Sequence, residues 1–232
     1  MKTNFDQIMS WLAEYEGGYV NHPRDPGGAT NRGVTQRVYD AYRRRKGQSP
    51  RSVRQLTDNE HDAIYLAQYW MPVRGDHLAP GVDASVFDMA VHSGVSRAVK
   101  TLQRVLGVKA DGVIGEITLA ALDKAIKARG VAPIIIDFNK RRMSFLRRLS
   151  TFSTFGRGWT RRVVGQREGA QTDDIGVVDR SVMLAAGAGR DIPKPRGSVK
   201  GRAEDFDLSF IGRLIEAFAA VLEALFQKKG VA

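Results

Sequence analysis

Hydrophobic residues recur at intervals of three and four positions along most of the first 165 residues, which is the spacing of one face of an α-helix. Alternation of apolar and polar residues, the pattern of strands, is not sustained outside residues 21–33. Thr35 can cap one helix, and Thr57 with Glu60 has the spacing of a capping box that opens another. The fold is therefore predicted to be mainly α-helical, with helices over residues 4–15, 35–46, 57–69, 82–92, 96–107 and 118–128, and a longer one from Pro133.

Proline and glycine interrupt this pattern early in the chain. Gly17 and Gly18 end the first predicted helix, and residues 21–33 hold two prolines and three glycines. Such a density of residues that break regular structure predicts an irregular loop or a small hairpin. The paired glycines also remove side chains beside the helix end, which leaves room for a polymer to approach.

The length of 232 residues and the hydrophobic content of 43% favour two globular units over one large core. We predict a first domain over residues 1–90 and a second over residues 91–165. Residues 166–204 are rich in Gly, Asp and Arg and show little periodicity, so they are predicted to form a linker. Residues 205–229 predict an amphipathic C-terminal helix with one narrow polar stripe.

The predicted C-terminal helix is too apolar to remain bare in water. Four partners for its apolar face remain open, namely its own domain, another protein, a second copy of the chain and the surface of a membrane. An amphipathic pattern alone does not choose among them.

The net charge of +11 is concentrated in one region. Residues 91–165 hold 15 Lys and Arg against 4 Asp and Glu, whereas residues 1–90 and 166–232 are each balanced. A concentrated basic surface indicates a polyanionic partner, and charge alone leaves nucleic acid, anionic lipid and acidic cell-wall polymer open. Nucleic acid is not expected, because the basic run at residues 43–45 fits a solvated helix face and no aromatic-interleaved basic motif occurs.

Glu16 is the candidate general acid. It lies four residues after Leu12, at the end of the apolar face of the first predicted helix, whereas Glu14 lies on the opposite face. Apolar surroundings disfavour a charged carboxylate, which raises its pKa and keeps it protonated. Such an acid can protonate a glycosidic oxygen. The same pattern also fits a Glu that ends a helix in solvent.

Two further residues can complete this chemistry. Asp25 lies nine residues after Glu16, and Thr30 follows five residues later. Inverting glycoside hydrolysis needs a base or a water-orienting group opposite the acid, and a loop folded over the helix end can supply both. Taken singly, Asp25 also fits an ordinary turn and Thr30 an ordinary loop hydroxyl.

Tyr19, Asn31 and Trp70 are candidate sugar contacts, because aromatic faces and amide groups suit N-acetylated saccharides. Trp70 also fits the core, since large aromatic residues are usually well buried. Asp88, within an apolar stretch, is interpreted as a hydrogen-bonded structural residue. The chain has no cysteine and its four histidines show no paired ligand spacing, so neither a metal site nor a cofactor is expected.

Several runs of residues resemble one known family. Residues 16–21 (EGGYVN), 25–31 (DPGGATN) and 33–35 (GVT) are similar to the N-terminal signature of glycoside hydrolase family 108. That family comprises N-acetylmuramidases found as phage endolysins and as bacterial secretion-activator proteins. Residues 69–70 and 87–94 (FDMAVHSG) also resemble it, although an Asn is usual where His92 stands. Runs at residues 102–103, 106–108, 111–115 and 118–122 resemble its C-terminal peptidoglycan-binding domain, and the resemblance spans roughly residues 5–165.

The resemblance implies a lysozyme-like helical domain with a small loop or hairpin at its active site, followed by a helical peptidoglycan-binding domain. It implies that Glu16 is the catalytic acid. The order of Glu16, Asp25 and Thr30 also resembles that of phage lysozymes, in which the Asp and the Thr handle the attacking water. The interval from Asp25 to Thr30 is one residue shorter than in those enzymes, so these two roles carry over less directly.

The predicted function is hydrolysis of the β-1,4 bond between N-acetylmuramic acid and N-acetylglucosamine, with the basic domain holding peptidoglycan. Two alternatives remain open: a lytic transglycosylase, which also uses one Glu but forms an anhydro sugar, and a non-enzymatic protein that anchors to the wall. The N-terminus lacks the apolar core and cleavage site of a secretory signal. We therefore expect synthesis in the cytoplasm and action on the wall, in the periplasm, after release by a route without a signal peptide.

Overall fold

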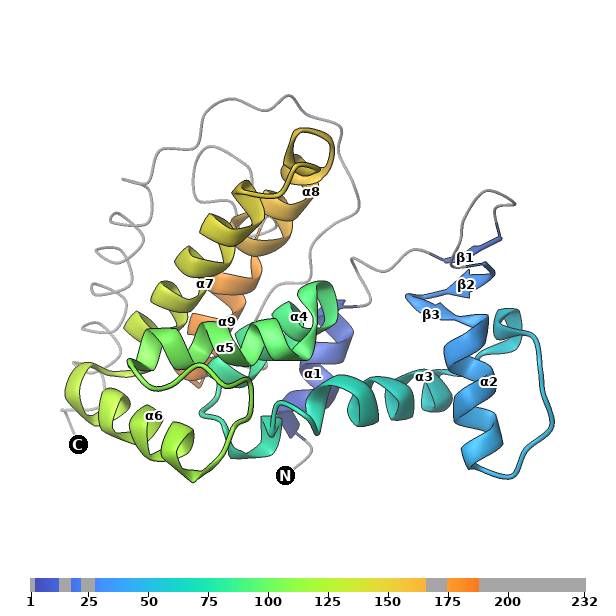
Figure 1. Cartoon of the computed structure of the whole chain (residues 1–232), viewed down its shortest axis with the longest axis horizontal. Coiled ribbons are helices and arrows are strands. Elements are labelled where there is room, and N and C mark those ends of the chain that lie inside the picture. The colour runs from blue at the N-terminus through green and yellow to red at the C-terminus, as the bar shows by residue number, and fades with distance from the viewer. Residues whose placement is uncertain (1–2, 13–17, 22–27, 166–174, 188–232) are drawn as a thin grey trace, which may run out of the picture. The chain divides into compact units, whose positions relative to one another are not determined.

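The computed structural model describes residues 3–12, 18–21, 28–165 and 175–187. This part of the chain is mainly helical with one small sheet (Figure 1), which confirms the predicted fold class. The described α-helices are α1 (Thr3–Leu12), α2 (Gln36–Arg45), α3 (Asp58–Tyr65), α4 (Val82–Ser93), α5 (Val95–Leu106), α6 (Glu116–Arg129), α7 (Val131–Arg147), α8 (Phe152–Val164) and α9 (Val177–Ala185). Shorter helical turns are η1 (Val53–Gln55), η2 (Leu66–Trp70) and η3 (Gly75–His77), and the strands are β1 (Tyr19–Val20), β2 (Thr30–Asn31) and β3 (Val34–Thr35).

The helix boundaries follow the capping residues that the sequence predicts. The Thr35 hydroxyl accepts a hydrogen bond from the backbone N–H of Val38 at the start of α2. Thr57 and Glu60 form the capping box of α3, in which each side chain accepts from the backbone N–H of the other. The predicted third helix is not α-helical throughout, because α3 continues after Tyr65 as the π-helical turn η2. These caps satisfy N–H groups that a helix leaves without partners in its first turn.

Helix α8 is absent from the predicted elements because Gly156 and Gly158 interrupt its pattern. Glycine lowers helix propensity by about 1 kcal/mol relative to alanine. The structure gives one of the two glycines a packing role, since a Cβ at position 156 would lie 2.8 Å from the ring of Phe152. Packing against α7 therefore outweighs the poor propensity of this segment.

The three strands form one antiparallel sheet in the order β1-β2-β3, in the region predicted to be a loop or hairpin. Tyr19 pairs with Asn31, and Thr30 pairs with both Val20 and Thr35. The turn between β2 and β3 requires positive φ at Arg32 and at Gly33, with values of 47° and 75°. Two consecutive residues with positive φ are characteristic of the tight turns that match the twist of a hairpin.

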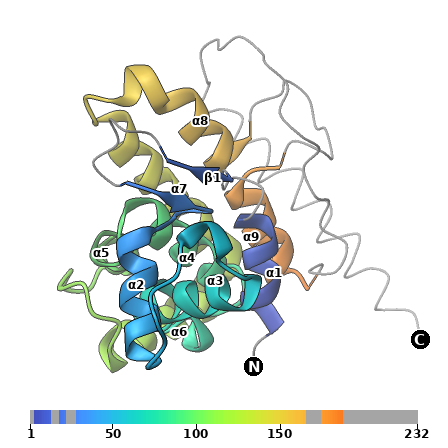
Figure 2. The same ribbon diagram turned by 90° about the vertical axis from the view of Figure 1, so that its right-hand side faces the viewer.

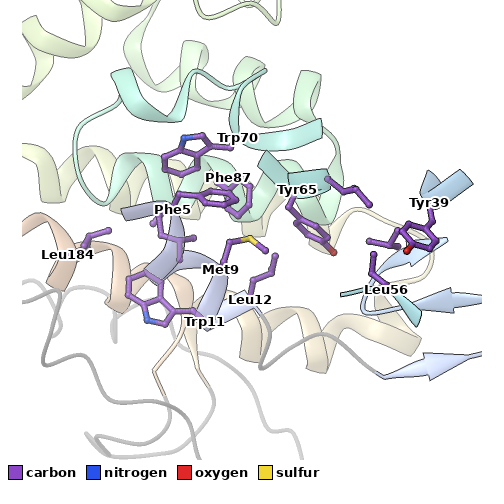
Figure 3. Close-up of a cluster of buried hydrophobic side chains, with 14 of the residues drawn as sticks. Phe5, Met9, Trp11, Leu12, Tyr39, Leu56, Tyr65, Trp70, Phe87 and Leu184 are labelled. Carbon is purple, nitrogen blue, oxygen red and sulfur yellow. The ribbon is translucent and has the colours of Figure 1, made fainter. Parts of the chain in front are cut away.

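Helix α4 lies at the centre of the packing. It contacts α1, α5, α7 and α9, and its residues from Val82 to Ala90 are all buried. On one side of it, the rings of Phe5, Trp70 and Phe87 meet edge to face with centroid separations of 5.3 to 5.8 Å. Figure 3 shows these rings grouped together, with Trp11 and Leu184 beside them and Tyr39 and Leu56 at the far end of the cluster.

The predicted linker over residues 166–204 is wrong for residues 177–185, which form α9. This helix packs against α4, α7 and α8, and Leu184 joins the same buried cluster as Phe5 and Trp11. Figure 2 shows α9 next to α1. The helix was missed because two of its buried positions are polar, Arg180 and Ser181, which breaks the apolar pattern.

Several predictions fall outside the described residues, including the C-terminal helix over residues 205–229. The predicted division between the first two domains, after position 90, falls inside α4, which ends at Ser93. Within the described ranges, no helix combines the length and the apolar character needed to cross a membrane.

Candidate active site

Glu16 and Asp25 lie outside the described residues, whereas the helix that precedes Glu16 in the sequence is described. The predicted apolar face of α1 is confirmed, because Phe5, Ile8, Met9 and Leu12 are all buried. Trp11 is also buried, and the guanidinium carbon of Arg180 from α9 lies 5.7 Å from its ring centroid. The helix is thus anchored on two sides, by α4 and by α9.

The hairpin places Thr30 and Asn31 in adjacent positions of β2 with different environments. The Thr30 hydroxyl is half-buried and donates a 3.1 Å hydrogen bond to the carbonyl of Gly28. The Asn31 amide is buried and donates to the carbonyl of Val53 at 3.0 Å. Asn31 therefore ties the sheet to η1, and in this structure its amide nitrogen is committed to the protein.

Tyr19 of β1 is the most accessible of the three candidate sugar contacts, with 37% of its surface exposed. The guanidinium carbon of Arg54 lies 5.2 Å from its ring centroid. A cation over one face holds the ring in place. An accessible aromatic ring is suited to stacking on a sugar.

Trp70 is placed differently from the other two candidates. Its ring is buried between Phe5 and Phe87, and a Cβ at Gly75 would lie 2.3 Å from one of its carbons. Trp70 is therefore a core residue, and its prediction as a sugar contact is wrong. A sugar could reach this ring only by displacing the side chains packed around it.

The turn of the hairpin is held by α3 and the residues just before it. The Arg32 side chain forms an ion pair with Asp58 at 2.5 Å and donates to the carbonyl of Leu56 at 3.0 Å. The Arg32 carbonyl accepts from the Tyr65 hydroxyl at 3.2 Å and lies 3.2 Å from Nε2 of His61. Positive φ is unfavourable for a residue other than glycine, so these contacts stabilise the conformation that presents Thr30. Nothing in the sequence pattern singled out Arg32.

Asp88 is confirmed as a structural residue within an ion cluster that we define as Asp88, Arg142 and Arg162. Its carboxylate lies 2.7 Å from a terminal nitrogen of Arg142 on α7 and 2.8 Å from one of Arg162 on α8. Burial alone would raise the pKa of Asp88, but the two guanidinium groups outweigh it and hold the pKa far below its ordinary value. Asp88 is therefore a permanent carboxylate that joins three helices.

His92 lies one turn after Asp88 on α4 and next to the same ion cluster. Burial lowers its pKa to about 4, and the positive charges of Arg142 and Arg162 act in the same direction. The imidazole is consequently neutral near pH 7, and its Nδ1 lies 3.0 Å from the Ser93 hydroxyl. Among the described residues, no group of three His, Cys, Asp or Glu side chains could hold a metal ion.

Asp83 is a buried carboxyl group at the start of α4. It accepts hydrogen bonds from the backbone N–H groups of Gly81 and Ala84, both at 2.7 Å, and from the Asn4 amide at 2.9 Å. Burial raises the pKa of Asp83 to about 6, although all three hydrogen bonds act in the opposite direction. A carboxyl with these three donors caps the helix, and we do not assign it to catalysis.

This pKa gives Asp83 a measurable effect on stability. Because folding raises its pKa from the ordinary value of 3.8 to about 6, its contribution is complete below 3.8 and is lost as the pH rises through 6. We expect the parent to lose about 2 kcal/mol of unfolding free energy relative to Asp83→Asn between about pH 4 and about pH 7. Urea unfolding of both proteins at both pH values measures this change, and a constant difference would contradict it.

Comparison with known proteins agrees with this architecture. Residues 9–94 match the family model described as glycosyl hydrolase 108, and residues 97–164 match one described as a predicted peptidoglycan domain. The fold and the two matches define the class of protein, a glycoside hydrolase that carries a peptidoglycan-binding region and acts on peptidoglycan. A search of curated proteins found no match.

A solved structure of Brucella abortus SagA is similar to this chain. The sequence identity is 41%, the match covers 80% of this chain and 97% of that chain, and the TM-score is 0.63. Together with the family match, this similarity shows that the chain belongs to the glycosyl hydrolase 108 family.

Proposed function

We propose that the chain is an N-acetylmuramidase that hydrolyses the β-1,4 bond between N-acetylmuramic acid and N-acetylglucosamine. Membership of the glycosyl hydrolase 108 family and the peptidoglycan-binding region support the substrate class. The observation that carries the proposed mechanism is the buried apolar face of α1, since Glu16 is the next position on that face in the sequence. A carboxyl group that continued this apolar face would be partly desolvated, and desolvation favours the protonated acid.

In the proposed reaction, Glu16 donates its proton to the glycosidic oxygen as the bond to the anomeric carbon breaks. Asp25 accepts a proton from a water molecule, whose oxygen attacks the anomeric carbon from the opposite face. Thr30 orients that water through its hydroxyl. One water is consumed, and the product ends in a reducing N-acetylmuramic acid.

Mass spectrometry of the fragments released from purified sacculi tests the bond and the outcome. We expect fragments with reducing N-acetylmuramic acid ends, because hydrolysis adds water at the anomeric carbon. Anhydro-muramic ends would instead identify a lytic transglycosylase. Release of no fragments by the folded protein would favour the non-enzymatic anchor. Reducing N-acetylglucosamine ends would show that the other glycosidic bond is cleaved.

Two further proposals concern where the enzyme acts and what else it contacts. We propose that the chain is made in the cytoplasm and acts on the wall in the periplasm. We also propose that the amphipathic segment over residues 205–229 contacts a membrane surface or a protein partner, because its sequence is too apolar for a bare helix in water. Flotation with anionic vesicles, comparing the full chain with a truncation after residue 204, tests the membrane contact.

A further inference from the structure

Aromatic side chains gather along α8, the last helix of the region that matches the peptidoglycan domain. The rings of Phe155 and Trp159 are stacked, with centroids 5.9 Å apart and an angle of 29° between their planes. Trp159 also meets Phe152 at 6.2 Å and His92 of α4 edge-on at 5.7 Å. Trp159 is therefore fixed by rings on several sides, while Phe155 has its ring partner on one face.

The side chains of Trp159 and Phe155 differ in how far they are buried. Trp159 is half-buried and packs against the buried residues Met143, Leu146 and Val163 between α7 and α8. Phe155 leaves 54% of its surface exposed. A phenylalanine with that exposure adds little to the core, and exposed aromatic residues beside an anchored ring are typical of binding surfaces. The fold holds Trp159 rigidly and presents Phe155 to solvent.

Gly158 lies between the two rings in sequence and leaves space beside them. A Cβ at this position would meet no atom within 4 Å, so the fold does not need a glycine there for packing. Within a helix, glycine costs about 1 kcal/mol relative to alanine. Its effect is to leave open space on the same face as Phe155, because positions three apart in a helix are neighbours. We call Phe155, Gly158 and Trp159 the α8 aromatic surface.

Charge points to the kind of polymer that this surface meets. The surrounding region, residues 91–165, carries 15 Lys and Arg against 4 Asp and Glu, and half-buried Arg161 follows Trp159 closely on α8. Glycan strands of peptidoglycan combine sugars, which offer C–H faces to aromatic rings, with stem peptides that carry carboxylates. An exposed aromatic ring in a basic region complements both features.

We propose that the α8 aromatic surface is a sugar-stacking subsite that takes an N-acetylated hexose of the glycan strand. The proposal rests on the proposed function for its choice of glycan. His92 and Trp159 connect α4, the helix against which α1 packs, with α8. The subsite itself lies on α8, and α4 links it to α1, the helix that precedes Glu16 in the sequence. The subsite binds the glycan strand at a sugar away from the bond that is cleaved. This contact lengthens the time that the strand stays bound to the enzyme.

Tryptophan fluorescence reports on this subsite selectively. Of the three tryptophans, Trp11 and Trp70 are buried and Trp159 is half-buried. We expect titration of the Glu16→Gln protein with an N-acetylglucosamine tetramer to change the emission. The added Trp159→Phe replacement should remove most of that change while keeping an aromatic ring. An unchanged signal in the Trp159→Phe variant would overturn the proposal.

Binding to purified sacculi measures the contribution of the surface, again with Glu16→Gln so that no bond is cleaved. Phe155→Ala should weaken binding roughly threefold to tenfold, the range expected for one aromatic contact. Gly158→Val should weaken it similarly, because a branched side chain would stand where the sugar lies. Ile117→Ala is the matched control, since Ile117 is 77% exposed on α6 of the same region, and it should leave binding unchanged.

Each alternative has a distinct result. Equal weakening by Phe155→Ala and Ile117→Ala would show unspecific apolar adhesion and overturn the proposal. Unchanged binding to sacculi, together with weaker binding of Phe155→Ala to anionic phosphatidylglycerol vesicles, would overturn it in favour of a membrane contact. Circular dichroism of each variant checks that the helices are retained. Because these assays compare the binding of Phe155→Ala with that of Ile117→Ala in the same background, the difference between the two remains informative if Glu16 proves not to be the catalytic acid.

Discussion

Glu16→Gln is expected to reduce the clearing of purified sacculi by about a hundredfold or more, while leaving the protein folded. A positioned general acid contributes roughly 10²- to 10⁴-fold to the rate of a reaction. The amide has nearly the same shape as the acid but no acidic proton to give to the leaving oxygen. A fall in the turnover rate with little change in binding to sacculi is the expected signature.

Glu14→Gln is the matched control for this experiment. Glu14 is two residues earlier, helical spacing in the sequence predicts it on the opposite face from Glu16, and it undergoes the same chemical change. We expect it to clear sacculi at close to the parental rate. Equal clearing by Glu16→Gln and the parent would remove Glu16 from the mechanism. Equal loss in both variants would indicate that the end of the helix, rather than one acid, had been disturbed.

Asp88→Asn is expected to lower the free energy of unfolding by about 3 to 5 kcal/mol, the range for removing one partner of a buried ion pair. The replacement keeps the shape of the side chain but takes the negative charge away from Arg142, which is fully buried, and from Arg162. Chemical denaturation at neutral pH measures the change. The variant should also lose cooperativity between α4, α7 and α8, because the Asp88 carboxylate on α4 contacts both α7 and α8.

Asp137→Asn provides the comparison for Asp88→Asn. Asp137 pairs with Arg129 at 2.5 Å on the surface, with about two-fifths of each side chain exposed. Exposed pairs contribute about 0 to 1 kcal/mol, so this variant should remain close to the parent. A loss for Asp88→Asn no larger than that of the control would show that the buried cluster contributes little to stability.

The features that could be predicted from the sequence are those set by neighbouring residues. Thr57 and Glu60 are three positions apart, and the capping box that they form needs no information from the rest of the chain. The same is true of the apolar face of α1 and of the hairpin region, where dense glycine and proline indicate turns. Such features depend on helical geometry and backbone preference alone.

The features that were missed depend on residues far apart in the chain. Asp88 was identified as structural, but its partners lie 54 and 74 positions away on α7 and α8, where they are two among many arginines. Arg180 was assigned to a linker because a buried arginine does not look like a core position. Burial of a charged residue is decided by what surrounds it after folding, and one sequence does not contain that information directly.

Helix α9 has a consequence for how the enzyme is made. Leu184 completes a cluster that begins with Phe5, so the first and last described helices must meet before that cluster is closed. Contacts between residues so far apart in the sequence form late, because bringing them together costs the conformational entropy of the long chain segment between them. A nascent polypeptide that stops before α9 still exposes the apolar side of α1 and α4. The buried cluster that joins α1 to α9 can therefore close only after the ribosome has synthesised the chain beyond residue 185.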